Sequence, residues 1–304
     1  MSQVVEGGAT PAATVEATTP GDDFESLLRG DRRIAPRGSD RRRRPRKRVD
    51  LMGLPVDQMT EAGTIDTVLD AVRAGRGGCL FTPNLHHMQA FASGDDGAVY
   101  DRSSVLPGAR LVVADGMPLI WASRLRGTPL PERVAGSNLI MSLTSAAARD
   151  GASIFLLGGN PGAARACAER MRAEHPDLRI AGLMSPPQGF EKDKRALDEI
   201  VATLRAAAPE IVYLALGFPK QEALALQLSA QMPTTWFVGV GISFSFVCGE
   251  VRRAPRWMQA AGLEWIHRLV QEPRRLFRRY VVDGVPFAAR MFAHALRSRQ
   301  GGHD

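Results

Sequence analysis

Short apolar runs alternate with segments of helical spacing along most of this chain, and this alternation constrains the fold more than any other feature. Runs such as 78–82, 153–157 and 211–216 are each followed by a turn and a segment with apolar residues at helical spacing. Strands separated by helices of about 10–15 residues imply a parallel sheet with helices on both faces. The sequence therefore predicts an α/β fold, a Rossmann-like, mostly parallel sheet of roughly six strands.

The individual segments follow from the same pattern. The expected strands cover residues 49–53, 78–82, 111–114, 153–157, 179–183, 211–216 and 235–240. The expected helices cover residues 60–73, 85–91, 137–149 and 193–208, with further helices after residues 162 and 219. Ser137 or Asn138 is expected to cap the helix over 137–149.

The 304 residues divide into three parts by composition. Residues 1–48 are rich in Gly, Ala, Thr, Pro and Arg, and such a segment cannot bury enough apolar surface to offset its ordering entropy. We expect a disordered basic N-terminal tail there, an α/β domain over 49–250, and an Arg-rich amphipathic helical appendage over 251–304. With 44% hydrophobic residues in the whole chain, the α/β domain can build a real core.

Positive charge is concentrated at the two ends of the chain. Residues 41–48 hold seven basic side chains, and the stretch 252–299 holds eleven Arg against three acids. Both regions predict an anionic partner, such as phosphates, a lipid surface or nucleic acid. The C-terminal stretch interleaves Arg with aromatic and aliphatic residues, which suits a segment lying on an anionic bilayer; a helical pair packed on the domain is the alternative.

The chain carries three widely separated cysteines, and no signal peptide or apolar run of 18 residues is recognisable. These features favour a cytoplasmic protein that is soluble or bound to a membrane only at its surface.

The first candidate site residue follows the apolar run 111–114. Asp115-Gly116 ends this strand, and Arg133 follows after a loop punctuated by Pro. In an open α/β sheet, ligands meet the carboxyl ends of the strands, so Asp115 and Arg133 would be a base and a cation at one site. The alternative is that Asp115 only caps the next helix.

Three further junctions carry candidate residues. The turn 158–162, GGNPG, joins a strand to a helix, where free backbone N–H groups and the helix dipole favour an anion. Tight turning alone would also explain it. GFPKQE at 217–222 and GVG at 239–241 follow the next two strands. The chain shows neither GxGxxG spacing nor a P-loop Lys-Ser/Thr after these turns.

Together these strings resemble the WecG/TagA/CpsF bacterial glycosyltransferases, glycosyltransferase family 26. The resemblance covers about Val49 to Tyr280. The matching strings are Thr82-Pro83-Asn84, Asp115-Gly116, Arg133-Val134-Ala135-Gly136, FLLGGNPG at 155–162, GFPKQE at 217–222, GVG at 239–241 and RRAPRWMQAAGLEWIHRLVQEPRRLFRRY at 252–280. In this order and spacing the combination is specific.

The resemblance implies an inverting glycosyltransferase that moves a sugar from a UDP-sugar onto a polyprenyl-diphosphate-linked saccharide. It implies work at the inner face of the cell membrane in cell-envelope, capsule or exopolysaccharide biosynthesis. N-acetylmannosamine or its uronic acid is the typical donor sugar in such proteins, and UDP-glucose is an alternative. Whether the protein is a monomer or a homo-oligomer stays open.

The resemblance also implies site residues. Asp115 would be the general base, Arg133 would position or neutralise phosphate, and Gln221 would contact the sugar or the nucleotide. The remaining expected substrate-binding residues are Thr82, Asn84, Gly158, Gly159, Asn160, Gly217, Lys220, Gly239, Gly241, Arg268, Arg275 and Arg278. The last three would close over the diphosphate and contact the membrane.

No metal or other cofactor is expected. The chain holds no Asp-x-Asp motif that would clamp a divalent metal on UDP, so Arg side chains and helix N-termini are the expected stabilisers of the departing diphosphate. His86 and His87 would point about 100° apart on a helix, which disfavours joint metal binding. We treat these two histidines as ordinary surface residues or as neighbours of the site.

Two positions depart from the family pattern. Ser245 and Asn138 stand where relatives often carry Asp. Both replace a charge by a neutral polar group, so transfer chemistry should survive while the choice of donor becomes open.

Two other classes of protein fit the sequence less well. A Rossmann-type dehydrogenase is disfavoured because GxGxxG and an acidic residue about 20 positions further on are missing. A nucleic-acid-binding protein could use the basic tail, but this leaves the α/β domain unexplained, so nucleic acid is not an expected partner.

Overall fold

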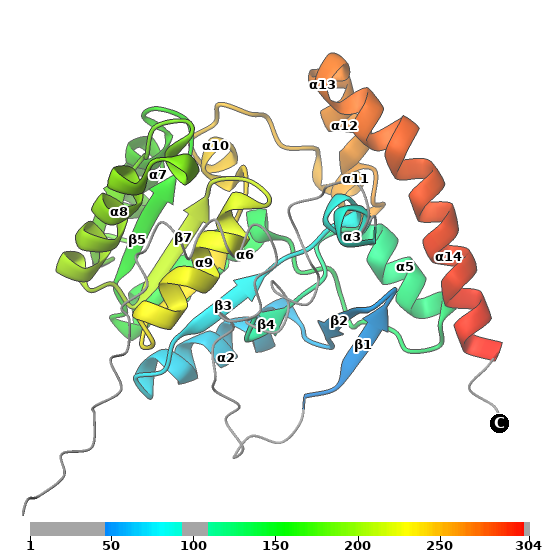
Figure 1. Ribbon diagram of the computed structural model, residues 1–304, viewed down its shortest axis with the longest axis horizontal. Coiled ribbons are helices and arrows are strands. Elements are labelled where there is room, and N and C mark those ends of the chain that lie inside the picture. Colours follow the sequence, from blue (N-terminus) through cyan, green and yellow to red (C-terminus); the bar gives the residue numbers. More distant parts are fainter. Residues whose placement is uncertain (1–45, 93–108, 301–304) are drawn as a thin grey trace, which may run out of the picture.

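A computed structural model of the protein describes residues 46–92 and 109–300. Its centre is a six-stranded sheet in which every neighbouring pair is parallel (Figure 1). The strands in spatial order are β4 (Leu111–Val112), β3 (Gly78–Phe81), β8 (Trp236–Gly239), β7 (Ile211–Ala215), β5 (Ile154–Gly158) and β6 (Ile180–Met184). The predicted α/β class, parallel arrangement and approximate strand number are confirmed.

The central strands are apolar on both faces because helices cover both sides of the sheet. Along β7, Ile211 and Tyr213 belong to one buried cluster, whereas Val212 and Leu214 belong to the other. Alternate residues of a strand point to opposite faces, which explains this division. The edge strand β6 lacks this double cover, and none of its residues is buried.

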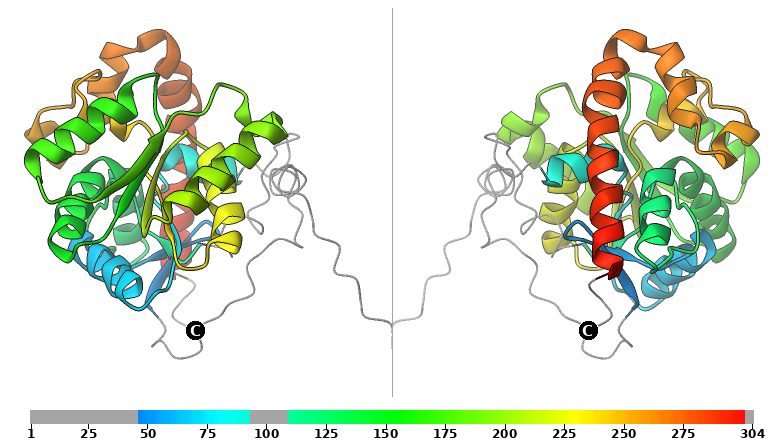
Figure 2. Two further views of the ribbon diagram at one scale, coloured as in Figure 1. Left: turned by 90° about the vertical axis from the view of Figure 1, so that its left-hand side faces the viewer. Right: turned by 90° about the vertical axis from the view of Figure 1, so that its right-hand side faces the viewer.

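Helices cover both faces of the sheet, as expected. On one face lie α2 (Glu61–Arg73), α6 (Gly136–Asp150) and α7 (Ala163–Glu174). The other face is covered by α3 (Leu85–Ala92), α5 (Met117–Leu125), α8 (Lys194–Ala207) and α9 (Lys220–Gln231) (Figure 2). A short 3₁₀ turn, η2 (Phe190–Lys192), precedes α8.

The expected strand over 49–53 does not join the parallel sheet. It is β1 (Arg48–Leu51), which pairs antiparallel with β2 (Leu54–Asp57), a strand that was not predicted. The carboxylate of Asp57 anchors this hairpin, because it accepts hydrogen bonds from Arg48 Nε at 2.9 Å and from the Val112 backbone N–H at 2.9 Å. Pro55 hid β2 from the sequence pattern, since Pro within an apolar run demotes a predicted strand.

The last residues of the basic stretch 41–48 therefore belong to the folded part of the chain. Arg46 Nε lies 3.5 Å from the Asp57 carboxylate and Arg48 begins β1, so disorder was the wrong expectation for these last residues. The rest of the predicted tail, residues 1–45, lies outside the described residues.

The C-terminal region after the sheet is helical, as expected, but more broken. It contains α10 (Ser243–Val247), α11 (Arg256–Ala260), α12 (Glu264–Gln271), α13 (Pro273–Phe277), the π-helix η3 (Arg278–Gly284) and α14 (Val285–Gln300). The predicted helical appendage is interrupted at Gly262, where φ is +73° and a Cβ would lie 2.7 Å from Met117 Cγ. Close packing on α5 therefore ends α11.

The long helix α14 packs this region against the α/β body, by which we mean the six-stranded sheet and the helices on its two faces. Phe287, Met291 and Ala295 are buried, and α14 runs alongside α5 (Figures 1 and 2). In the part of the chain that the structure describes, no helix combines the length and apolarity needed to cross a bilayer.

Candidate active site

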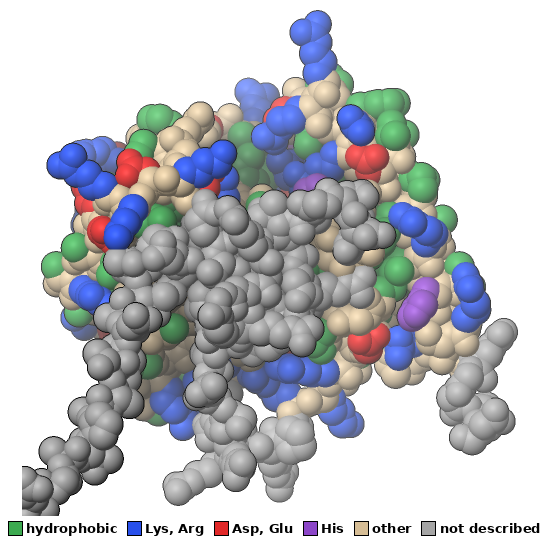
Figure 3. All heavy atoms as spheres, in the orientation of Figure 1, with side chains coloured by type: hydrophobic (Ala, Val, Ile, Leu, Met, Phe, Trp, Pro, Cys, Tyr) green, Lys and Arg blue, Asp and Glu red, His purple; other side chains and the backbone are tan. Residues whose placement is uncertain are grey.

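Most of the predicted site residues lie at the ends of β3, β4, β5, β7 and β8 or directly after them, and the parallel sheet brings all five junctions to its carboxyl edge. This edge is where open α/β sheets bind ligands. The surface is recessed between the body and the C-terminal helices, and Lys and Arg side chains gather around the recess (Figure 3).

Asp115 is held by its own backbone and by the loops beside it. Its N–H donates to Pro83 O at 2.9 Å, and the Val134 N–H donates to Ala114 O at 2.9 Å. The Gly136 backbone N–H also hydrogen-bonds the Asp115 carboxylate. Helix α5 instead begins after Gly116, with no side-chain cap, so the alternative in which Asp115 merely caps this helix is wrong.

Burial raises the pKa of the Asp115 carboxyl to about 6. Arg133 and Arg253 lower this pKa and Glu264 raises it, so three charged neighbours tune the effect of desolvation. A carboxyl with a pKa near the working pH can both take up and release a proton efficiently. The role of Asp115 as a general base stays a prediction, with which this pKa is consistent.

Thr82 packs beside Asp115's loop. Its hydroxyl donates to Gly239 O at 3.3 Å, and a Cβ on Gly136 would lie 3.2 Å from Thr82 Oγ1. The Asn84 side chain binds the first turn of α3, because its Oδ1 accepts a hydrogen bond from the His86 N–H at 3.0 Å. The structure therefore brings Thr82 and Asn84 to this edge, and their contact with substrate stays a prediction.

Gln221 is buried and joins two junctions. Its Oε1 accepts from the Gly241 N–H at 3.1 Å, and its Nε2 donates to Glu222 Oε1 at 2.9 Å. Gln221 packs closely on Gly239, since a Cβ there would lie 2.8 Å from Gln221 Nε2 and the amide would have to shift. Gln221 thus ties the β7 and β8 loops together, and its predicted contact with the sugar or nucleotide stays a prediction.

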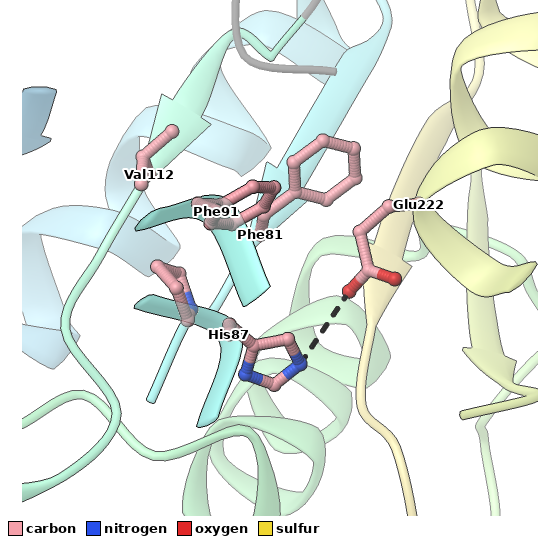
Figure 4. Close-up of a pocket in the computed structure, with 6 residues that line it drawn as sticks. Phe81, His87, Phe91, Val112 and Glu222 are labelled. Carbon is pink, nitrogen blue, oxygen red and sulfur yellow. Dashed lines mark ion pairs between the residues drawn. The ribbon is translucent and has the colours of Figure 1, made fainter. Parts of the chain in front are cut away.

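A small pocket adjoins this junction and was not predicted (Figure 4). Its wall is apolar except for Glu222 and His87, whose Oε1 and Nε2 atoms lie 3.9 Å apart. Burial raises the pKa of Glu222 to about 7 and lowers the pKa of His87 to about 3. His87 is therefore neutral at physiological pH, so this contact is not a charged pair despite its short distance.

The GGNPG turn is packed closely on its neighbours. A Cβ on Gly158 would lie 2.7 Å from Ala215 O, and one on Gly159 would lie 2.9 Å from the Phe244 ring. Asn160 is exposed, and its Nδ2 donates to Glu250 Oε2 at 3.1 Å. Ser245 Oγ donates to the same Glu250 oxygen at 2.8 Å. Tight turning thus accounts for both glycines, and anion binding by this turn stays a prediction.

The remaining residues of the β7 and β8 turns lie nearby. Gly217 and Gly241 both have positive φ angles, +75° and +55°. Lys220 Nζ lies 2.5 Å from Glu191 Oε1 and sits over the Phe190 ring. Lys220 is thus already paired with η2 in this structure.

Arg133 belongs to a charged cluster with Arg253 and Glu264, and of these three residues only Arg133 was predicted from the sequence. Arg133 Nη1 donates to Glu264 Oε2 at 3.0 Å, and Arg253 Nε lies 3.7 Å from Glu264 Oε1. Arg253 Nη2 donates to Ser137 Oγ at 2.9 Å and to Asn138 Oδ1 at 2.5 Å. The Arg253 and Glu264 side chains come from the C-terminal region and meet Arg133 beside Asp115.

The prediction that Ser137 or Asn138 caps α6 is wrong. The helix begins at Gly136 with Ala135 as N-cap and no side-chain cap hydrogen bond. Ser137 and Asn138 instead accept hydrogen bonds from Arg253, a residue more than a hundred positions away. Local sequence carried no signal for this competing partner.

The three C-terminal arginines predicted for the diphosphate differ in their surroundings. Arg268 lies over the Phe246 ring at 5.7 Å, and its Nε is buried without a hydrogen-bond partner. Arg275 pairs with Glu272 at 2.7 Å on the surface, and the Arg278 side chain is 86% exposed. Arg268 is thus the one of the three that turns toward the body.

Arg279 was not predicted, and it is half-buried. Burial is the main cause that lowers its pKa, and its positive charge helps to lower the pKa values of His86 and His87. Its Nε also lacks a hydrogen-bond partner. The adjacent Arg278 and Arg279 therefore point into different environments, which sequence spacing alone did not distinguish.

Across residues 46–92 and 109–300, no group of three or more His, Cys, Asp or Glu side chains is arranged to hold a metal ion. His86 and His87 lie next to each other with ring centroids 6.3 Å apart, and both pack against the Phe218 ring. Metal independence of the reaction stays a prediction.

These features define a Rossmann-like α/β protein whose site lies at the carboxyl edge of its sheet and is completed by charged residues of a C-terminal helical region. Residues 49–301 match the family described as "Glycosyl transferase WecG/TagA/CpsF family", and the chain belongs to that family.

Two relatives carry the name N-acetylglucosaminyldiphosphoundecaprenol N-acetyl-beta-D-mannosaminyltransferase. The relative from Bacillus spizizenii is 33% identical over 172 residues, which are 57% of this chain and 65% of the relative. The relative from Bacillus subtilis strain 168 is 31% identical over 186 residues, which are 61% of this chain and 69% of the relative. The chain thus spans about two thirds of the length of these relatives.

Proposed function

We propose that this protein is an inverting glycosyltransferase that moves a sugar from a UDP-sugar onto a polyprenyl-diphosphate-linked saccharide. The observation that carries the proposal is Asp115, a carboxyl with a pKa of about 6 beside Arg133 at the ligand-binding edge of the sheet. Membership of the WecG/TagA/CpsF family supports the transferase over a dehydrogenase or a nucleic-acid-binding protein.

In the proposed reaction, the Asp115 carboxylate removes the proton from the attacking hydroxyl of the acceptor. The acceptor oxygen then bonds to the anomeric carbon as the bond from that carbon to UDP breaks on the opposite face. UDP leaves with the electron pair of that bond, so negative charge grows on its diphosphate. We propose that Arg133 stabilises this charge without a metal ion.

The names of the two relatives specify an N-acetylmannosaminyl group and an acceptor with N-acetylglucosamine on undecaprenyl diphosphate. We propose an N-acetylmannosamine-type sugar as the donor group here. Glucose and a uronic acid are the alternatives, because Ser245 and Asn138 alter the pattern of charges. Glu250, hydrogen-bonded to Ser245, places a carboxylate near the altered position and would disfavour an anionic uronic acid donor.

We further propose that the C-terminal region rests on the inner face of the cell membrane. Among residues 46–92 and 109–300, most of the exposed large apolar side chains lie in it, including Trp257 (65% exposed), Val270 (75%) and Phe277 (54%). Arg274, Arg275 and Arg278 are exposed among them. Apolar side chains flanked by cations suit a surface with anionic headgroups.

A direct test incubates the purified chain with a panel of UDP-sugars and a short-chain polyprenyl-diphosphate-linked N-acetylglucosamine acceptor, with product read by mass spectrometry. We expect transfer from UDP-N-acetylmannosamine, activity that persists in EDTA, and the opposite anomeric configuration in the product. Absence of transfer from every donor in the panel would contradict the proposed function.

A further inference from the structure

The charged cluster beside Asp115 has more guanidinium donors than the acceptors it holds. We propose that Arg133 and Arg253 together form a diphosphate-binding site, and that Glu264 occupies this site until a diphosphate displaces it. This inference rests on the proposed function for the identity of the anion. It adds Arg253 as a ligand and Glu264 as a competing internal anion.

The geometry of Glu264 is that of an anion bound between two cations. Its two carboxylate oxygens face different arginines, Oε2 toward Arg133 Nη1 at 3.0 Å and Oε1 toward Arg253 Nε at 3.7 Å. A diphosphate can also place separate oxygens on two guanidinium groups, and Arg is suited to bind it through paired N–H donors. The Glu264 carboxylate therefore imitates part of such a ligand.

Glu264 satisfies this pair of arginines incompletely. The 3.7 Å approach to Arg253 Nε exceeds hydrogen-bond distance, and this buried Nε has no hydrogen-bond partner. Arg253 is meanwhile fixed through Nη2 by Ser137 and Asn138, so its guanidinium is held in place without Glu264. A buried donor without an acceptor is costly, and a ligand with more oxygens could supply the missing one.

Glu264 also sits on an element that can move at low cost. None of the eight residues of α12 is buried, whereas the neighbouring Leu276 of α13 is. Displacing α12 would therefore uncover no fully buried side chain of this helix, and elements with few buried contacts open most readily. Arg133, by contrast, lies in the loop between α5 and α6, beside the buried residue Val134.

The test is calorimetric binding of UDP, inorganic pyrophosphate and farnesyl diphosphate to the full chain and to Glu264→Gln. We expect Glu264→Gln to bind pyrophosphate about tenfold more tightly, because the competing charge is gone. A gain for UDP but not for farnesyl diphosphate would assign the site to the donor, and the reverse result would assign it to the acceptor. Glu174→Gln removes a charge from an exposed pair with Arg170 and should change nothing.

The gain should depend on Arg253, so Arg253→Gln combined with Glu264→Gln should bind no more tightly than the unmodified chain. Unchanged or weaker pyrophosphate binding by a folded Glu264→Gln protein would overturn the inference and make Glu264 a docking contact only. If that variant does not fold, Glu264→Asp serves instead, with a smaller gain expected and no gain contradicting the proposal.

These measurements read anion affinity without turnover. A failure of sugar transfer therefore remains distinguishable from a failure of the two-arginine site.

Discussion

The α/β body and the C-terminal helices are built on opposite principles. In the body, strands such as β5 and β7 are buried on both faces. In the C-terminal region, α12 has no buried residue, and Trp257, Val270 and Phe277 are more than half exposed. Yet Arg253 and Glu264 of this region reach Arg133 beside Asp115.

This difference suggests a division of labour. A rigid sheet edge can hold a base in a fixed position, which proton transfer requires. A loosely packed helical region can supply cations and a membrane-facing surface, and it can still move when substrates enter. Changes in the body should therefore affect chemistry most, whereas changes in the C-terminal region should affect binding and membrane association most.

The largest expected effect is that of Asp115→Asn, which removes the proposed base from the body. We expect kcat to fall by about 10²- to 10⁴-fold, because the acceptor proton has no carboxylate to receive it. Binding of UDP, measured by calorimetry, should be retained. Asp198→Asn on the exposed face of α8 is a matched control, and full activity of Asp115→Asn would remove Asp115 from the mechanism.

The next effect concerns the C-terminal surface alone. Replacing Trp257, Val270 and Phe277 together by Ser should weaken binding to anionic lipid vesicles by about tenfold or more, since apolar insertion is lost. Co-sedimentation measures this change. Leu183→Ser alters an exposed apolar residue of β6 and should leave vesicle binding as it was. Equal losses in both proteins would argue against a membrane-facing C-terminal region.

The pH profile connects the two regions. Asp115 must be deprotonated to act, so kcat/KM should rise about tenfold per pH unit below its pKa of about 6 and level off above it. The Arg133 charge lowers the pKa of Asp115, so Arg133→Gln should move the rising part of the pH profile to higher pH. The Glu264 charge raises this pKa, so Glu264→Gln should move the rising part to lower pH. If the rising part of the profile moved in neither variant, a group other than Asp115 would control the pH dependence of kcat/KM.

The last expected effect is on stability rather than on catalysis or membrane binding, and it is at Glu222, inside the body. Its pKa rises to about 7 on folding from an ordinary value near 4.5, so its stabilising contribution is present below the unfolded pKa and is lost as pH rises through about 7. Glu222→Gln should therefore be more stable than the unmodified chain at pH 8, by about 1–3 kcal/mol, and no more stable at pH 4. Urea unfolding at both pH values measures this.

The exposed Glu199→Gln on α8 is the matched control for that measurement and should show no pH-dependent difference. Equal stability of Glu222→Gln and the unmodified chain at pH 8 would mean that water or a partner solvates this carboxylate.

Much of the fold was readable because periodicity reports burial directly. Runs such as 153–157 and 211–216 had to be strands covered on both faces, and the helices between them had to lie on those faces. The position of Asp115 at the carboxyl edge followed from the strand that precedes it. Each of these inferences depends on neighbours close in sequence, and local pattern is what a sequence displays.

The sequence by itself therefore determined the parallel α/β body, the edge at which ligands meet it, and the family to which the chain belongs. Only the tertiary structure decided that Ser137 and Asn138 hold Arg253 rather than cap α6, and that Glu264 lies between Arg133 and Arg253. It also decided that Arg279 turns inward while Arg278 faces solvent. The physical reason is that charged side chains take partners by proximity in space, and those partners lie far apart along the chain.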